Sequence, residues 1–76
     1  MVHSFVMIET APGDTESVLD SVAALAGVEE AHVVAGDYDV VVEVEGEDVQ
    51  ESIRTVSTDI RELEGVDDTR TYIALE

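Results

Sequence analysis

The strongest constraint on the fold is a short stretch of sequence that occurs twice. Leu25-Ala26-Gly27-Val28-Glu29-Glu30-Ala31 follows one helix-like segment, and Leu63-Glu64-Gly65-Val66-Asp67-Asp68-Thr69 follows another. In both copies a leucine ends an apolar helical stripe, a glycine suits the helix C-terminus, and a valine begins a β-rich run. The repetition predicts a chain built from two similar βαβ units.

Periodicity and turn residues predict six elements in the order βαββαβ. Two right-handed βαβ crossovers in one short chain give a ferredoxin-like α+β sandwich, with a four-stranded antiparallel sheet and both helices on one face. We expect residues 1–76 to form this single domain. The predicted strands are Val2 to Thr10, Val28 to Ala35, Tyr38 to Glu45 and Val66 to Leu75.

Both helices are predicted from an apolar stripe between two boundary signals. The first opens at Pro12-Gly13-Asp14, where Asp14 can cap free N–H groups, and ends at Gly27. The second begins at Gly46-Glu47-Asp48, with Asp48 and Glu51 at capping-box spacing, and ends at Gly65. The stripes are Val18, Val22 and Leu25 in the first helix, and Val49, Ile53, Val56, Ile60 and Leu63 in the second.

The first and last strands are apolar on both sides, whereas a sheet covered on one face alone should alternate apolar with polar residues. Val6 and Ile8 share one side of the first strand, and Phe5 and Met7 share the other. A second apolar face left in water would be a large adhesive patch. We therefore expect the sheet to pack against a second copy of itself, as in dimeric α+β barrels; single exposed apolar residues on a monomer are the simpler alternative.

The charge balance limits the partners of the chain. There are 19 Asp and Glu residues against 3 basic ones, all arginine, so the formal net charge is -16. Phosphate contacts need Lys and Arg, which argues against direct binding to nucleic acid. Concentrated salt screens such a surface, which favours a halophilic cytoplasmic protein. No apolar run approaches the length of a membrane span, and no export signal is seen.

The predicted hairpin turn is the most unusual local feature. Gly36, Asp37, Tyr38 and Asp39 combine a glycine, two carboxylates and an aromatic ring where backbone groups are left unpaired. Carboxylates accept hydrogen bonds from an ammonium group and free N–H groups receive a carboxylate, so this turn suits a small zwitterion. Turn conformation by itself explains the same glycine and aspartates equally well.

Little in the sequence supports metal binding or catalysis. There is no cysteine and no lysine, and His3 and His32 do not stand at a spacing that places two ligands on one metal. We predict no cofactor, no metal and no catalytic residue. Thr69 and Thr71 offer two hydroxyls on one side of the last strand, where β-propensity alone also accounts for them. Arg70 is expected to pair with the acidic surface.

An ordered set of motifs resembles the RAM (regulation of amino acid metabolism) domain, the effector-binding part of Lrp/AsnC transcription regulators, over nearly the whole chain. The motifs are Val6-Met7-Ile8-Glu9-Thr10, Pro12-Gly13, Gly27-Val28, Val33 through Asp39, Gly65-Val66 and Thr69-Arg70-Thr71-Tyr72. The resemblance implies the βαββαβ fold, sheet-to-sheet dimers that assemble into octamer-like rings, and an amino-acid effector bound where dimers meet. It places Gly36, Asp37, Tyr38 and Asp39 near the effector, with help from Thr69 and Thr71.

Full-length family members carry a helix-turn-helix domain before the RAM domain, and only Met1 precedes the first strand in this sequence. We therefore expect a stand-alone RAM type that does not contact DNA and acts through partners, including full-length relatives. Two alternatives stay open. One is a small dimeric enzyme of the ferredoxin-like class with a buried His3 or His32 as base, and the other is an ACT-type amino-acid-binding module, which fits the motifs less well.

Overall fold

The predicted order of strands and helices is reproduced in a computed structural model, which describes residues 2–48, 50, 54 and 58–75. Residues 50, 54 and 58–61 are also helical, and they belong to the second predicted helix. The defined elements are β1 (Val2–Thr10), α1 (Thr15–Ala23), β2 (Val28–Val33), β3 (Val40–Gly46) and β4 (Val66–Ile73).

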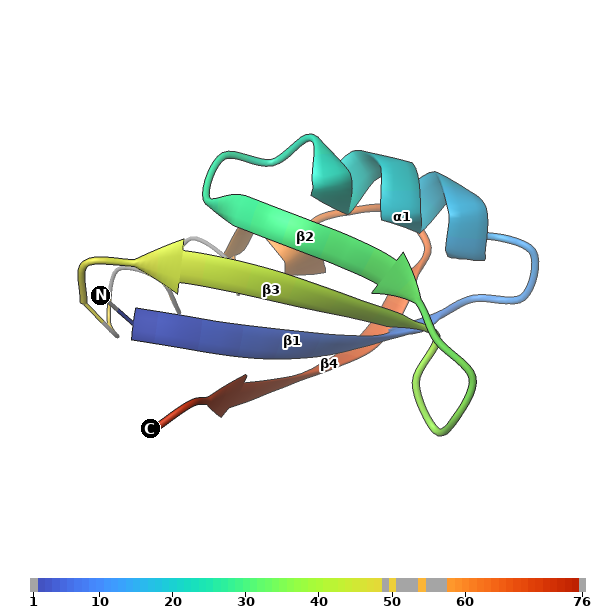
Figure 1. The fold of residues 1–76 in the computed structure, drawn as a ribbon. Coiled ribbons are helices and arrows are strands. Elements are labelled where there is room, and N and C mark those ends of the chain that lie inside the picture. Colours follow the sequence, from blue (N-terminus) through green and yellow to red (C-terminus); the bar gives the residue numbers. More distant parts are fainter. Residues whose placement is uncertain (1, 49, 51–53, 55–57, 76) are drawn as a thin grey trace.

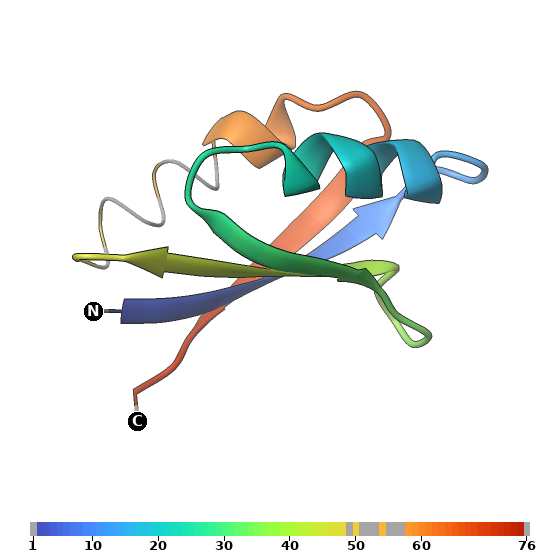
Figure 2. The same ribbon diagram turned by 45° about the horizontal axis from the view of Figure 1, so that its top comes forward.

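The four strands form one antiparallel sheet in the order β2-β3-β1-β4 (Figure 1). Each helical segment connects two strands that are not neighbours in the sheet, which is the ferredoxin-like arrangement. Figure 2 shows α1 and the helical residues 58–61 above the same face of the sheet. The predicted fold class is therefore confirmed, and none of the described helical residues covers the other face of the sheet.

The core lies between the sheet and these helical segments. Alternate residues of β1 and β3 point inward, since side chains of a strand alternate between the two faces of the sheet. Many of the inward residues are valine, whose branched side chain suits a pleated surface. The buried apolar residues are Val6, Ile8, Val18, Val22, Val40, Val42, Val44 and Ile60, each at most 3% exposed.

The repeated sequence forms the same turn twice. After α1, Leu25 N–H donates to Val22 O and Val28 N–H donates to Leu25 O. After the second helical segment, Leu63 N–H donates to Ile60 O and Val66 N–H donates to Leu63 O. Gly27 and Gly65 sit at the same point of the two turns with φ of 90° and 95°. The predicted equivalence of the two halves therefore extends to individual hydrogen bonds.

Several predicted element ends are wrong. α1 ends at Ala23 rather than Gly27, because its last turn is followed by the tight turn that holds Leu25. Asp14 precedes the helix, but its side chain makes no capping hydrogen bond. β4 ends at Ile73 rather than Leu75, which is 93% exposed.

The predicted start of the second helix is also displaced, because Gly46 is the last residue of β3. Asp48 lies in a bend before residue 50. The predicted capping partner Glu51 and the stripe residues Val49, Ile53 and Val56 lie outside the described residues. Of the remaining stripe, Ile60 is fully buried and Leu63 packs against the core.

Gly65 has much closer neighbours than Gly27. A Cβ at Gly65 would lie 2.9 Å from Asp14 Cβ and 3.1 Å from Val18 Cγ2, whereas a Cβ at Gly27 would meet nothing within 4 Å.

Gly27→Ala should lower the free energy of unfolding by about 1–2 kcal/mol, the cost of a left-handed backbone. Gly65→Ala should cost about 1–3 kcal/mol more because it also overpacks the start of α1.

Chemical denaturation in molar KCl measures both values. Gly36→Ala is a matched control, since Gly36 has neither a positive φ nor a neighbour within 4 Å of the added carbon. Equal losses for Gly65→Ala and Gly27→Ala would contradict the close approach of Gly65 to α1.

Candidate functional site

The connection between β2 and β3 is longer than the two-residue turn that the sequence suggested. Strand pairing stops at Val33 and Val40, so residues 34–39 form the loop. Val34 N–H donates to Asp39 O at 2.8 Å and closes the loop at its base. Residues 35–38 therefore project beyond the end of the sheet (Figure 1).

Asp39 fastens this loop to the rest of the domain. Its backbone N–H donates to Ile8 O at 2.9 Å. Its carboxylate oxygen Oδ2 accepts Thr10 N–H at 2.9 Å and the Thr10 hydroxyl at 3.2 Å. Thr10 Oγ1 also shares a hydrogen bond of 2.8 Å with Thr15 Oγ1 at the start of α1. Asp39 thus joins the loop, the end of β1 and the first turn of α1.

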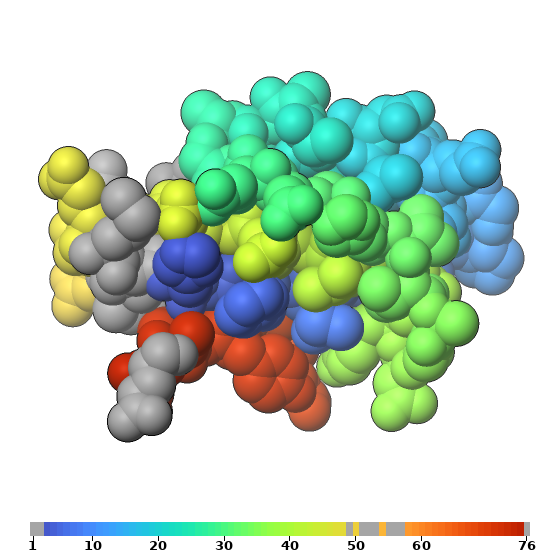
Figure 3. Space-filling model, in the orientation of Figure 1, coloured from blue at the N-terminus to red at the C-terminus, as the bar shows by residue number. Residues whose placement is uncertain are grey.

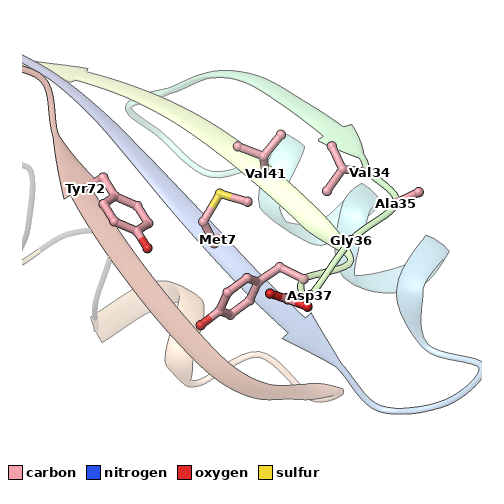
Figure 4. A pocket seen from close by; sticks show the side chains of 8 residues that line it. Met7, Val34, Ala35, Gly36, Asp37, Val41 and Tyr72 are labelled. Atoms are coloured by element: carbon pink, nitrogen blue, oxygen red, sulfur yellow. The ribbon is translucent and has the colours of Figure 1, made fainter.

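A hollow of about 440 Å³ lies beside the loop on the uncovered face of the sheet (Figure 4). Met7 and Val41 come from neighbouring strands, and Tyr72 stands on the other side of β1. Asp37 lies at the loop side of the hollow (Figure 4). The hollow therefore offers an apolar surface with a carboxylate beside it. Its lining residues are Met7, Val34, Ala35, Gly36, Asp37, Tyr38, Val41 and Tyr72.

Arg70 lies next to this hollow on the same face, opposite Met7 in the strand register. A side-chain hydrogen bond with Tyr72 raises the pKa of Arg70, and the tyrosines and Asp68 act in the same direction. The guanidinium is thus a fixed positive charge on the same face as the hollow. Asp68 is among the groups that favour the charged guanidinium, so the pairing of Arg70 with the acidic surface stays a prediction.

The structure places Gly36, Asp37 and Tyr38 together at the hollow, but the two threonines predicted for the site lie elsewhere. Thr69 and Thr71 lie opposite Ile8 and Val6 in the register, so they point to the helix-covered face. Thr69 Oγ1 accepts a hydrogen bond of 3.3 Å from Arg61 Nε. Within one chain these hydroxyls and the loop are on opposite sides of the sheet, and a ligand role for either remains a prediction.

The uncovered face carries the second apolar surface that the sequence predicted, over β1, β3 and β4. Figure 3 views the molecule from this side, with the strands next to one another in green, yellow, blue and red. Phe5 lies opposite Tyr72, and Met7 lies opposite Val41. Tyr72 is 52% exposed. Strand alternation in the sequence identified Phe5, Met7 and Tyr72, but only the register shows that Val41 completes the patch.

The two histidines also lie on this face. His3 forms an ion pair with Glu45, and His32 Nε2 lies 3.6 Å from Glu30 Oε1. Their side chains are 46% and 60% exposed, so a single chain does not provide the buried imidazole that the enzyme alternative requires.

The described residues contain no group of three or more His, Cys, Asp or Glu side chains able to hold a metal ion. In the part of the chain that is described, no helix is both long and apolar enough to cross a membrane.

Comparison with known proteins decides the family. The family model of the Lrp/AsnC ligand-binding domain matches residues 3–76, almost the entire chain. The chain belongs to the Lrp/AsnC family. The RAM-type resemblance of the motifs is thereby confirmed.

The Lrp/AsnC relatives are transcriptional regulators. The leucine-responsive regulatory protein of Haemophilus influenzae is 29% identical over 76 residues, which cover all of this chain and 46% of that protein. The regulator LysM of Saccharolobus solfataricus is 32% identical over 75 residues, covering 97% of this chain and 52% of that protein. The chain thus spans about half the length of the curated relatives it matches.

Solved structures give the same assignment. A protein from Thermus thermophilus superimposes with a TM-score of 0.93 at 34% identity, covering 100% of this chain and 95% of that one. AsnC of Escherichia coli superimposes with a TM-score of 0.86 at 25% identity, covering 99% of this chain and 51% of that one. The structure is therefore that of a ligand-binding domain of an Lrp/AsnC transcriptional regulator.

The position of Asp39 generates a stability prediction. Asp39→Ala should lower the free energy of unfolding by about 1–3 kcal/mol, because the partly buried Thr10 N–H loses its acceptor. Asp37→Ala should stay within about 0.5 kcal/mol of the parent, since Asp37 is exposed. Urea unfolding of both variants in the same salt measures the difference, and equal stability of the two would contradict the anchoring role of Asp39.

Proposed function

We propose that this chain is an amino-acid sensor that binds its effector at contacts between copies, and regulates transcription through partner regulators rather than by contacting DNA. The observation that carries the proposal is the loop of residues 34–39. Asp39 holds its base to β1, while Gly36, Asp37 and Tyr38 line an apolar hollow. The other face of that hollow is open, as a site completed by a second chain would be.

The chemistry of the loop suits the charged groups of an amino acid. Asp37 carries a carboxylate that can accept hydrogen bonds from an α-ammonium group, and such charge-assisted bonds are among the stronger ones in proteins. Asp39 is less available, because Oδ2 already accepts two hydrogen bonds from Thr10. Of the two aspartates proposed for the ammonium, we therefore favour Asp37.

Thr69 and Thr71 would take part only from a second copy or at a different contact, since they lie on the opposite face of their own sheet. Tyr38 and the backbone of Gly36 complete the proposed set on the loop side. A pocket assembled in this way exists only in the oligomer. Binding would then favour the assembled state, because a ligand stabilises whichever state contains its site.

The charge of the chain supports action through other proteins. A net charge of -16 repels phosphates, and we propose that DNA contact comes from full-length relatives that join the assembly. The same charge motivates the proposal of a halophilic, cytoplasmic protein whose dimers and octamer-like rings form in concentrated salt. We propose no enzymatic activity, since the described residues offer no activated nucleophile or buried base.

A binding experiment with the twenty amino acids tests this function. We expect light scattering in molar KCl to show a dimer or larger ring whose mass or thermal stability responds to a few amino acids. Asp37→Asn should weaken binding of those amino acids by at least about tenfold, the loss of roughly one charge-assisted hydrogen bond.

Asp20→Asn on the exposed side of α1 removes the same charge far from the loop and should leave the affinity unchanged. An assembly that ignores all twenty amino acids would refute the sensor proposal. Unchanged affinity in Asp37→Asn would refute the role of this carboxylate alone.

A further inference from the structure

The effector proposed above carries a carboxylate as well as an ammonium group, and the acidic surface of the chain restricts where that carboxylate can be held. The formal net charge is -16, and the sequence contains three arginines and no lysine. Like charges repel, so an anionic group binds such a chain only beside a positive charge or convergent N–H donors. At the base of the loop, the N–H groups of Val34 and Asp39 already donate to carbonyl oxygens of the chain. A side-chain cation near the hollow is therefore the best candidate partner of the carboxylate.

Of the three arginines, only Arg70 lies on the face of the sheet that carries the hollow. Arg54 belongs to the second helical segment, and Arg61 donates through Nε to Thr69 Oγ1 on the helix-covered face. In β4, Thr69 and Thr71 point to that covered face, so Arg70 between them points to the opposite one. Arg70 is therefore the one fixed positive charge that the described residues place on the side of the hollow.

The position of Arg70 in the sheet brings it to the edge of the hollow. Its Cα pairs with that of Met7, and Tyr72 is the next outward residue of the same strand. Both Met7 and Tyr72 line the hollow, and Figure 4 shows Met7 between Tyr72 and the loop residue Asp37. An amino acid that lies over Met7 can therefore meet Asp37 on one side and Arg70 on the other.

The guanidinium of Arg70 is exposed and has donors to spare. In the described part of the chain both ion pairs are formed by histidines, and neither includes Arg70. Asp68 on the same face of β4 acts on the guanidinium without forming one of these ion pairs. A guanidinium has several N–H donors, so the hydrogen bond with Tyr72 leaves others for the two oxygens of a carboxylate.

His32 is the other basic side chain near the hollow. It lies opposite Val41, a lining residue, on the neighbouring strand. Its Nε2 is 3.6 Å from Glu30 Oε1, and an imidazole is charged only when it is protonated. A ligand carboxylate would compete with Glu30 at His32, whereas at Arg70 it meets a permanent charge whose planar fork matches its two oxygens. These differences favour Arg70.

We propose that Arg70 binds the carboxylate of the effector, while Asp37 holds its ammonium group on the other side of the hollow. This inference rests on the amino-acid sensor proposed above and adds the partner of the carboxylate. The apolar surface of Met7, Val41 and Tyr72 is available to the carbon atoms of the ligand. The effector is then recognised through both of its charges, and a ligand that carries only one of them binds more weakly.

Isothermal titration calorimetry in molar KCl tests this assignment with leucine and leucinamide and with methionine and methioninamide, probes that suit an apolar hollow. At about pH 6 both members of each pair keep a charged ammonium group, because the α-amino pKa is roughly 7.7–8.0. The parent chain should bind each amino acid at least about tenfold more tightly than its amide, the loss of roughly one charge-assisted hydrogen bond. In Arg70→Gln the two dissociation constants should agree within about threefold.

Matched variants separate this role from a general loss of charge. Arg54→Gln removes the same charge from an exposed position of the second helical segment and should keep the preference of the parent chain for the amino acid. His32→Gln should keep it too. Arg70→Lys retains the charge without the fork and should keep part of it. Asp37→Asn should weaken the amino acid and its amide equally, because both carry the ammonium group.

A preference that survives in Arg70→Gln, or one that is lost in His32→Gln instead, would overturn the assignment to Arg70 and leave the sensor proposal intact. Equal binding of amino acid and amide by the parent chain would do the same. If another of the twenty amino acids binds in place of leucine and methionine, the comparison with its own amide decides the assignment. Absence of binding by all twenty would overturn it together with the sensor.

Discussion

Burial of one valine-rich face of the sheet holds this domain together. β3 lies between β2 and β1, and Val40, Val42 and Val44 are almost completely buried. The chain has no disulfide and no described metal cluster to assist, so α1 and the second helical segment must cover this face. Removing apolar surface from water is the main favourable contribution available to so small a domain. The helices therefore cannot be used to cover the other face.

Because both helical segments cover the valine-rich face, the opposite face of the sheet stays exposed. It is apolar enough along β1, β3 and β4 to associate, yet it belongs to a chain with a net charge of -16. Salt screens the repulsion among exposed carboxylates, whereas hydrophobic attraction is not weakened by such screening. The proposed association through this face would then depend on salt concentration as well as on shape. Such a balance would suit the proposed sensor, whose output is its state of assembly.

The two aspartates in the loop of residues 34–39 have different surroundings. Asp39 is occupied by contacts within the chain, where it satisfies a backbone donor at the end of β1 and connects to Thr15 of α1. Asp37 lines the hollow, beside side chains from β1, β3 and β4. An effector that contacts the loop would therefore touch a segment already joined to the core, the open sheet face and the start of a helix.

The sequence by itself determined the order of the elements, the ferredoxin-like fold, the apolar character of the second sheet face and the family. These follow from local periodicity and from the repeated Leu25-to-Ala31 pattern, which depend only on neighbours along the chain. The tertiary structure decided which predicted site residues meet. Strand register turns Thr69 and Thr71 to the helix side and places Met7 opposite Val41, and the fold commits Asp39 to Thr10. Register and bulges depend on contacts between residues far apart in sequence, and no local pattern encodes them.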